Sequence, residues 1–289
     1  MIPGAFDYFA PHSLEEAFEL LAEHGDDAKL LAGGHSLLPL MKLRLAAPRV
    51  LVDLGRIGDL TYIRDEGDEI VIGAMTTHAA IEHSALLRRR ASLLAETAAE
   101  IGDVQVRNRG TIGGSLVHAD PAADYPAAVL ALEAQFTLAS RTGTRSVAAG
   151  DFFVDLLTTA IQPGEILTEI RFAADAPRTG SAYCKLHQPA SGFALVGVAA
   201  RVRLDGKGKC EAATVGVTGV SSKAYRATQV EKALLGKAAN EKVIPQAAAK
   251  AAAGVEPLSD LHASARYRKA MAEVLARRAL TEAFNRARK

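Results

Sequence analysis

Leu30-Leu31-Ala32-Gly33-Gly34-His35-Ser36-Leu37-Leu38 is the stretch from which the fold can be predicted. The apolar run that ends at Ala32 is typical of a short buried strand. Gly33 and Gly34 allow a sharp turn and let the backbone approach a ligand closely, because neither residue carries a Cβ. Ser36 stands where a helix N-cap is expected, before an apolar segment. A strand, a glycine turn and a helix start in this order expose backbone N–H groups that suit an anionic phosphate.

A second stretch, Arg109-Gly110-Thr111-Ile112-Gly113-Gly114-Ser115-Leu116, has the same character. The first stretch alone is better explained by an ordinary turn, so the inference depends on the pair. Two phosphate-sized cradles indicate a ligand with a diphosphate. Acidic residues at Asp120 and Asp124 follow closely and suit ligand hydroxyl groups. We therefore expect a dinucleotide with a sugar-like chain, such as FAD.

Composition excludes several classes of protein. The chain has 289 residues, 49% of them hydrophobic, and a net charge of +1, which argue for a folded core and against nucleic acid as the main partner. Cys184 and Cys210 lack metal-ligand spacing, so we expect no metal site and no iron–sulfur cluster in this chain. The first residues lack a basic region followed by an apolar one, so we expect no signal peptide, and no apolar run reaches bilayer length. We expect a cytoplasmic protein that is not an integral membrane protein.

Strand and helix signals in the first part of the chain predict a mixed domain. A capping box at Ser13 and Glu16 begins a helix that ends at Gly25. Asp124 is expected to cap a helix with Pro126 in its first turn. Further elements are expected as a strand at 50–54, a hairpin at 61–72, a helix from Thr76 or Thr77 to His83, a helix at 86–101, a hairpin at 135–148 and a strand at 164–172.

The turn-rich stretch 173–180 predicts a domain boundary, which gives domains 1–176 and 177–289. Beyond it we expect three strands and then three helices, which with the first part gives the α+β class. The strands are 182–186, 194–204 and 210–217, and the helices begin near Ser222, Asn240 and Ser264. The arginines of the last helix are expected on a solvated or interface face: Arg266, Arg268, Arg277, Arg278, Arg286 and Arg288.

Other nucleotide and hydrolase signatures are absent from the sequence. It contains no GxGxxG, no GxxxxGK[ST] and no HExxH. Gly34-His35-Ser36 begins like the nucleophile elbow GxSxG, but Leu38 stands where that strained turn needs a small residue. Hydrolase chemistry is therefore disfavoured.

Several motifs together resemble the FAD-binding medium subunits of the molybdenum hydroxylase (xanthine dehydrogenase) family, nearest to its carbon monoxide dehydrogenase branch. They are Ala32-Gly33-Gly34-His35-Ser36, Thr111-Ile112-Gly113-Gly114, Ala119-Asp120-Pro121 with Asp124, and the late Tyr267-Arg268. The resemblance covers essentially the whole chain. It implies a two-lobed vanillyl-alcohol-oxidase (PCMH)-type FAD-binding domain, followed by a smaller C-terminal domain of a three-stranded sheet with helices.

The resemblance implies an FAD-carrying electron-transfer subunit with no catalytic residue of its own. Its partners would be a small subunit with [2Fe–2S] clusters and a large molybdopterin subunit, assembled as a dimer of heterotrimers. The substrate would be oxidised at molybdenum in the large subunit, so carbon monoxide, a heterocycle and an aldehyde all remain compatible with this chain. Electrons would leave for an external acceptor, and association with the inner face of the membrane stays open. A stand-alone FAD-dependent oxidoreductase of the same fold and a non-catalytic scaffold are the alternatives.

By position, the resemblance assigns FAD contacts to residues of both glycine stretches and to three residues beyond them. Asp124, with Asp120, would hold hydroxyl groups, and Lys185 would lie near the flavin N1 edge and favour the anionic reduced flavin. Ser115 departs from the asparagine of many relatives, so its backbone rather than its side chain is the expected contact. No Cys or His is placed for covalent attachment, so we expect noncovalent FAD. The glycine-stretch contacts are Ala32, Gly33, Gly34, His35, Ser36, Leu37, Thr111, Ile112, Gly113, Gly114 and Ser115.

Three further expectations concern residues around this site. Ile101 and Gly102 are weaker candidates, for covering the adenine. His118 is expected to be a packed histidine rather than a ligand. Gly33→Val and Gly114→Val are expected to abolish FAD binding while the fold persists, because a branched side chain would fill the path of the ligand.

Overall fold

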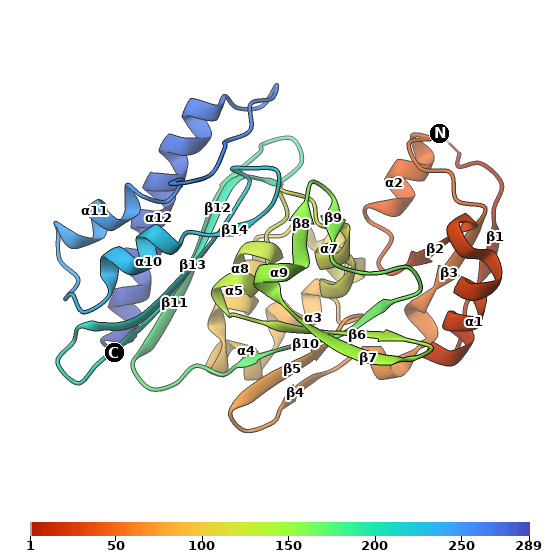
Figure 1. Cartoon of the computed structure of the whole chain (residues 1–289), viewed down its shortest axis with the longest axis horizontal. Helices are drawn as coiled ribbons and strands as arrows, with labels where there is room; N and C mark the ends of the chain where they lie inside the picture. Colours follow the sequence, from red (N-terminus) through yellow and green to blue (C-terminus); the bar gives the residue numbers. More distant parts are fainter. Residues whose placement is uncertain (1) are drawn as a thin grey trace.

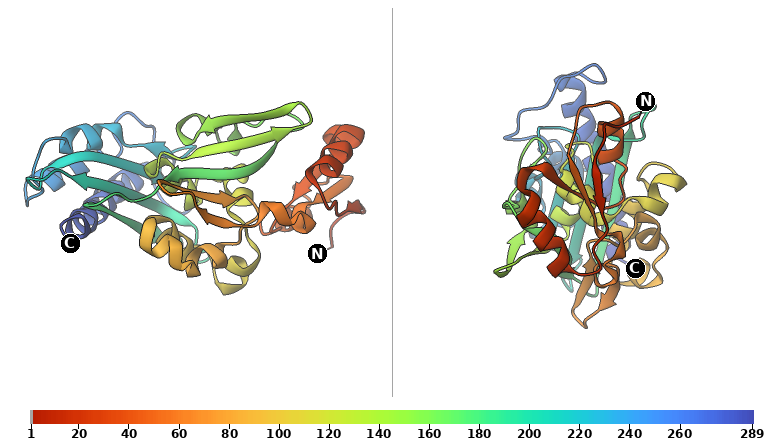
Figure 2. Two further views of the ribbon diagram at one scale, coloured as in Figure 1. Left: turned by 90° about the horizontal axis from the view of Figure 1, so that it is seen from below. Right: turned by 90° about the vertical axis from the view of Figure 1, so that its right-hand side faces the viewer.

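The computed structural model describes residues 2–289 as three parts in a row: a small N-terminal lobe, a central lobe and a C-terminal domain (Figures 1 and 2). The strands are β1 Asp7–Phe9, β2 Ala28–Leu31, β3 Val50–Asp53, β4 Ile63–Asp65, β5 Glu69–Gly73, β6 Gln135–Ser140, β7 Gly143–Ala148, β8 Phe153–Asp155, β9 Thr158–Thr159, β10 Ile166–Ala173, β11 Thr179–His187, β12 Ala194–Leu204, β13 Cys210–Thr218 and β14 Tyr225–Arg226. The α-helices are α1 Leu14–His24, α2 Leu37–Lys42, α3 His78–His83, α4 Ala85–Arg90, α5 Ser92–Ala99, α6 Val104–Arg109, α7 Ile112–His118, α8 Tyr125–Ala131, α9 Ala149–Phe152, α10 Thr228–Leu234, α11 Val243–Ala248 and α12 Ala265–Ala287. Short 3-10 helices lie at Gly25–Asp27, Leu54–Arg56 and Gly58–Leu60.

The N-terminal lobe is a parallel sheet in the order β1-β3-β2, packed against α1. Helix α1 begins as the capping box predicts, because the Ser13 hydroxyl accepts the N–H of Glu16. The Glu16 carboxylate closes the box on the N–H of His12, at 2.8 Å, rather than on Ser13 itself. Strand β2 lies at one edge of this sheet, and the first glycine turn begins just after β2 ends (Figure 1).

The central lobe is an antiparallel sheet in the order β4-β5-β10-β6-β7, with helices α3 to α8 beside it. Both predicted hairpins, β4–β5 and β6–β7, are confirmed. The helix predicted at 86–101 is two helices, α4 and α5, because Ala91 leaves the helical conformation with φ −162° and ψ 59°. The lobe thus surrounds its core of apolar side chains with short helices rather than one long one.

The C-terminal domain has a sheet in the order β11-β12-β13-β14, covered on one face by α12. Helices α5 and α8 of the central lobe pack on the same sheet. The approach of α8 is so close that a Cβ at Gly216 would lie 2.0 Å from the carbonyl oxygen of Ala127. The domain and the central lobe therefore share a continuous buried contact along β12 and β13.

Two predicted details of this domain are wrong. The sheet has a fourth strand, because Tyr225 and Arg226 pair with β13 instead of starting a helix near Ser222. Helix α10 begins only at Thr228, and the alanine-rich stretch after Asn240 forms just the short α11. Hydrogen bonding of Tyr225 and Arg226 to the edge of the sheet overrides the helix propensity of this segment.

The long helix α12 begins at its predicted cap, Ser264, whose hydroxyl accepts the N–H of Tyr267. Its arginines are not all solvated, because Arg268 is only 4% exposed. The Arg268 guanidinium donates to the carbonyls of Leu195 and Gly219, at 2.7 and 2.6 Å, and to the Asp260 carboxylate at 2.7 Å. A residue predicted on the surface therefore ties the ends of β12 and β13 to the helix.

Across residues 2–289, no helix has both the length and the apolar composition needed to span a bilayer.

Candidate functional site

The first glycine turn offers a run of free backbone donors. Gly34 has φ +76°, a conformation that glycine adopts without strain. Within the described chain, the N–H groups of residues 33–37 have no hydrogen-bond acceptor, while the Gly34 carbonyl accepts the N–H of Leu38. Ser36 precedes α2 as predicted, but its side chain makes no capping bond. Five consecutive unpaired donors at a strand-to-helix turn suit an anion such as a diphosphate.

The second glycine stretch differs from the first, because it is the first turn of α7. Thr111 is the N-cap, and its hydroxyl accepts the N–H of Gly114 at 3.1 Å. Ile112 and Gly113 donate to the carbonyls of Thr76 and Ala74. These backbone donors are already satisfied, so this stretch contributes its shape and its hydroxyl groups rather than a second set of free N–H groups.

The structure brings the two glycine stretches into direct contact. A Cβ at Gly33 would lie 2.3 Å from the carbonyl oxygen of Arg109 and 2.6 Å from the Cα of Gly110. A Cβ at Gly114 would lie 3.4 Å from the Cβ of Ala32. The reason given for Gly33→Val in the sequence-based expectation is therefore wrong: Gly33 is needed so that two backbone segments can meet, and its missing Cβ points at the protein.

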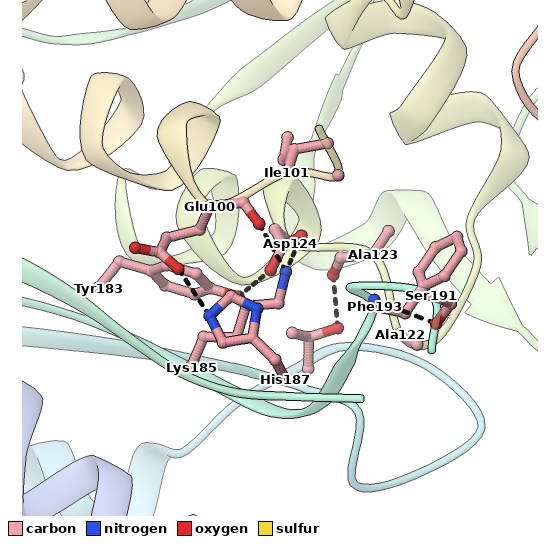
Figure 3. A network of polar contacts seen from close by, with 12 residues as sticks. Glu100, Ile101, Ala122, Ala123, Asp124, Tyr183, Lys185, His187, Ser191 and Phe193 are labelled. Carbon is pink, nitrogen blue, oxygen red and sulfur yellow. Dashed lines mark hydrogen bonds and ion pairs between the residues drawn. The ribbon is translucent and has the colours of Figure 1, made fainter. Parts of the chain in front are cut away.

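Asp124 and Lys185 form a buried ion pair between the central lobe and the C-terminal domain (Figure 3). The Lys185 Nζ lies 2.9 Å from Oδ2 of Asp124 and donates to the carbonyl of Glu100 at 2.7 Å. The Tyr183 hydroxyl donates to Oδ1 of Asp124 at 2.6 Å. Asp124 is the N-cap residue of α8 as predicted, but its side chain makes no capping bond, because both of its oxygens are engaged in this cluster. Burial raises the pKa of Asp124, and Lys185 opposes that shift.

The chain after α5 lies over this cluster. Oε2 of Glu100 lies 2.9 Å from Nε2 of His187, and both side chains are about half exposed. The Arg107 guanidinium donates to the carbonyls of Ile101 and Gly102. Figure 3 shows Ile101 and Glu100 beside Asp124 and Lys185. Ile101 thus lies close to the predicted ligand residues of both domains.

His78 and Tyr125 fill the space between the second glycine stretch and the ion pair. The N–H of His78 donates to the Gly110 carbonyl at 2.9 Å. Its ring packs against the edge of Tyr125 with centroids 5.2 Å apart. Burial lowers the pKa of His78 to about 4, so the ring is neutral at ordinary pH. Sequence reasoning singled out neither residue, because nothing local marks them as neighbours.

Asp120 and His118 lie outside this cluster. The Asp120 carboxylate accepts the N–H of Ala122 at 2.8 Å and so stabilises the turn before α8. His118 is half-buried at the end of α7. Tyr183 was missed, although its spacing of two residues from Lys185 on a strand places both on one face.

Comparison with known proteins identifies the family. The family described as "FAD binding domain in molybdopterin dehydrogenase" matches residues 4–174, and "CO dehydrogenase flavoprotein C-terminal domain" matches residues 181–283. The chain belongs to the family of proteins that carry the FAD-binding domain of molybdopterin dehydrogenases. These matches agree with the resemblance noted in the sequence, and with a PCMH-type FAD-binding domain followed by a smaller α+β domain.

Relatives in this family are similar over the full length. The chain is 44% identical over 286 residues to the carbon monoxide dehydrogenase medium chain of Hydrogenophaga pseudoflava, covering 99% of each chain. It is 39% identical to the 6-hydroxypseudooxynicotine dehydrogenase complex subunit alpha of Paenarthrobacter nicotinovorans, covering 100% of this chain and 97% of that one.

Solved structures give the same result for the fold. A chain of the Hydrogenophaga pseudoflava carbon monoxide dehydrogenase that lacks the Mo-pyranopterin moiety matches with a TM-score of 0.96 and 46% identity, covering 99% of both chains. A chain of quinoline 2-oxidoreductase from Pseudomonas putida 86 matches with a TM-score of 0.93 and 35% identity, covering 100% of both. Chains this similar thus occur in enzymes named for unlike substrates.

Proposed function

We propose that this chain is the FAD-carrying electron-transfer subunit of a molybdenum hydroxylase complex. The observation that supports the proposal most strongly is the run of free backbone N–H groups from Gly33 to Leu37, in a chain of the FAD-binding family. The partners would be a small subunit with [2Fe–2S] clusters and a large subunit with molybdenum on a pterin. The substrate would react in the large subunit.

The residues present fit a bound FAD. The free donors of residues 33–37 would hold the negatively charged diphosphate, and Gly33 keeps the second glycine stretch against them. The remaining contacts predicted from the sequence, at Thr111 to Ser115, Asp120, Asp124 and Lys185, stand as part of this proposal. When bound, the flavin accepts electrons one or two at a time and passes them on.

The chain's own residues would bind and tune the cofactor rather than react with a substrate. The buried Lys185 and Asp124 carry opposite charges, so together they place a neutral, strongly dipolar pair in the site. Relatives named for carbon monoxide, 6-hydroxypseudooxynicotine and quinoline are similar to this chain over essentially the full length, which suggests that the substrate is selected elsewhere in the complex. Carbon monoxide is the substrate that the relatives' names favour for the first assay.

Purification through a tag on this chain from its native host tests the proposal. We expect FAD, iron and molybdenum to copurify, and the flavin absorbance to bleach without air when the right substrate is added. The assay should include carbon monoxide and a panel of heterocycles and aldehydes. A tagged chain that contains no flavin and cannot be reconstituted with FAD would refute the proposal. A chain that binds FAD and oxidises a substrate without partners would establish the stand-alone oxidoreductase instead.

Two further expectations are kept as proposals. We place the domain boundary between residues 176 and 177, which limited proteolysis followed by mass spectrometry tests. We also propose that the complex is a cytoplasmic dimer of heterotrimers associated with the inner face of the membrane. Cell fractionation and sedimentation of the purified complex test those two statements.

A further inference from the structure

Tyr183 and Lys185 act on the same carboxylate. They lie two residues apart on β11 and so point to one face of the sheet. Tyr183 donates to Oδ1 of Asp124 at 2.6 Å, and Lys185 contacts Oδ2 at 2.9 Å. Each oxygen of the buried carboxylate therefore has one donor, and both donors come from the other domain (Figure 3).

Gly197 provides the space in which the Tyr183 ring lies. It pairs with Lys185 across β11 and β12 and with Thr218 across β12 and β13. A Cβ at Gly197 would lie 2.2 Å from the Tyr183 hydroxyl oxygen, 2.8 Å from Cγ2 of Thr218 and 3.0 Å from Cζ of Tyr183. Any side chain at this position would displace the hydroxyl from Asp124. The absence of a side chain at Gly197 thus leaves room for the Tyr183 hydroxyl.

Few polar or charged side chains lie around the Asp124 carboxylate. Lys185 and Tyr183 face Asp124 from β11, Glu100 faces it from the segment after α5, and Tyr125 follows it in the chain. The carboxylate of Glu100 is turned toward His187, at 2.9 Å. The side chains of Lys185 and Asp124 are 1% and 5% exposed, so water screens this pair weakly.

We propose that Tyr183, seated over Gly197, is a positioning residue that holds the Asp124 carboxylate as the fixed counter-charge of Lys185 and thereby sets the net charge of the flavin site. The part of this inference that concerns flavin rests on the proposed function. The part that concerns the charge of Asp124 is a property of the chain itself.

The direction of the effect follows from the hydrogen bond. The Tyr183 hydroxyl donates to the charged form of Asp124 and so opposes the increase in pKa that burial causes. Without this donor, Asp124 takes up a proton at higher pH. A protonated Asp124 leaves Lys185 uncompensated, and added positive charge makes a nearby flavin easier to reduce.

The experiment compares the full-length chain with its Tyr183→Phe variant, which keeps the ring and removes one oxygen. In the cofactor-free chain, the ¹³C shift of the Asp124 carboxyl, assigned with an Asp124→Asn variant, is followed against pH. We expect the Asp124 titration to move upward by about one to two pH units, the effect expected for a hydrogen bond to a charged group. In the FAD-loaded chain, the break in the plot of flavin potential against pH should move upward by the same amount.

Two further variants are measured beside Tyr183→Phe, one expected to give the same shift and one control. Gly197→Ala should produce the same upward shift, because its methyl group would displace the Tyr183 hydroxyl. Tyr62→Phe is the matched control, since Tyr62 donates to the Glu169 carboxylate at 2.7 Å on the central sheet, and it should leave the Asp124 titration unchanged.

An Asp124 titration that is unchanged in Tyr183→Phe would overturn the inference, whether or not the chain binds FAD. A shifted titration with a flavin potential that does not follow it would overturn the link to the flavin alone. Failure of the wild-type chain to bind FAD would count against the proposed function and leave the titration result standing.

Discussion

Gly33→Ala is the substitution whose consequence the structure specifies most closely. The added Cβ would lie 2.3 Å from the Arg109 carbonyl oxygen, whereas ordinary contact begins at 3.4 Å. The obstructing atoms are backbone, so no side-chain rotation relieves the clash. Overpacking of this kind costs about 1–3 kcal/mol. We expect the free energy of unfolding to fall by that amount.

The same clash should weaken FAD binding. Gly33 belongs to the turn with the free donors, and pushing it away from Arg109 distorts the cradle that would hold the diphosphate. If the bound form must restore the close contact, the strain of about 1–3 kcal/mol appears as a loss of affinity of roughly fivefold to 150-fold. Urea unfolding of the cofactor-free chain measures the stability, and quenching of FAD fluorescence on titration measures the affinity.

Gly58→Ala is the matched control for Gly33→Ala. A Cβ at Gly58 would meet no atom within 4 Å, so both measurements should match those of the unchanged chain. Wild-type stability and wild-type FAD affinity in Gly33→Ala would show that the two glycine stretches are not packed as described. That result would refute the reasoning.

Three further substitutions give defined outcomes. Lys185→Met leaves the buried Asp124 carboxylate without its cation and should lower the stability by about 3–5 kcal/mol, part of which the double variant with Asp124→Asn recovers in urea unfolding. Burial lowers the pKa of His78 from 6.5 to about 4. As the pH drops below 6.5, the imidazole is therefore protonated in the unfolded chain while it stays neutral in the folded chain. The free energy of unfolding should fall by up to about 3 kcal/mol between pH 6.5 and pH 4. His78→Phe should remove that pH dependence, and an identical slope in the variant would exclude His78 as its source. Arg268→Met should cost about 3–5 kcal/mol in thermal or urea unfolding, and Arg268→Lys should recover less than half, because an ammonium cannot replace the planar fork.

Local signals in the sequence were sufficient where a helix end depends on its own neighbours. Ser13 and Ser264 cap α1 and α12 as predicted, because the acceptor and the donor are three residues apart. The same reasoning failed for Ser36 and Asp124. No side-chain cap forms at either position, and the Asp124 carboxylate is bound by a lysine and a tyrosine of another domain.

Contacts between distant segments account for the other differences. Arg268 lies in a helix rich in exposed arginines, and only the ends of β12 and β13 make it a buried residue. Tyr225 joined a strand because β13 had a free edge. The glycine pattern could not show that Gly33 faces protein backbone, or that Ile112 and Gly113 donate to the carbonyls of Thr76 and Ala74. Those facts depend on tertiary packing, which spacing along the chain does not encode.

Hydrogen exchange of the backbone amides of residues 33–37, with and without FAD, tests the central claim most directly. In the cofactor-free chain these N–H groups have no protein acceptor and should exchange quickly. FAD should slow their exchange strongly, and the already bonded amides of Ile112 and Gly113 should change little. FAD that binds tightly while the amides of 33–37 keep exchanging at the free rate would contradict the account.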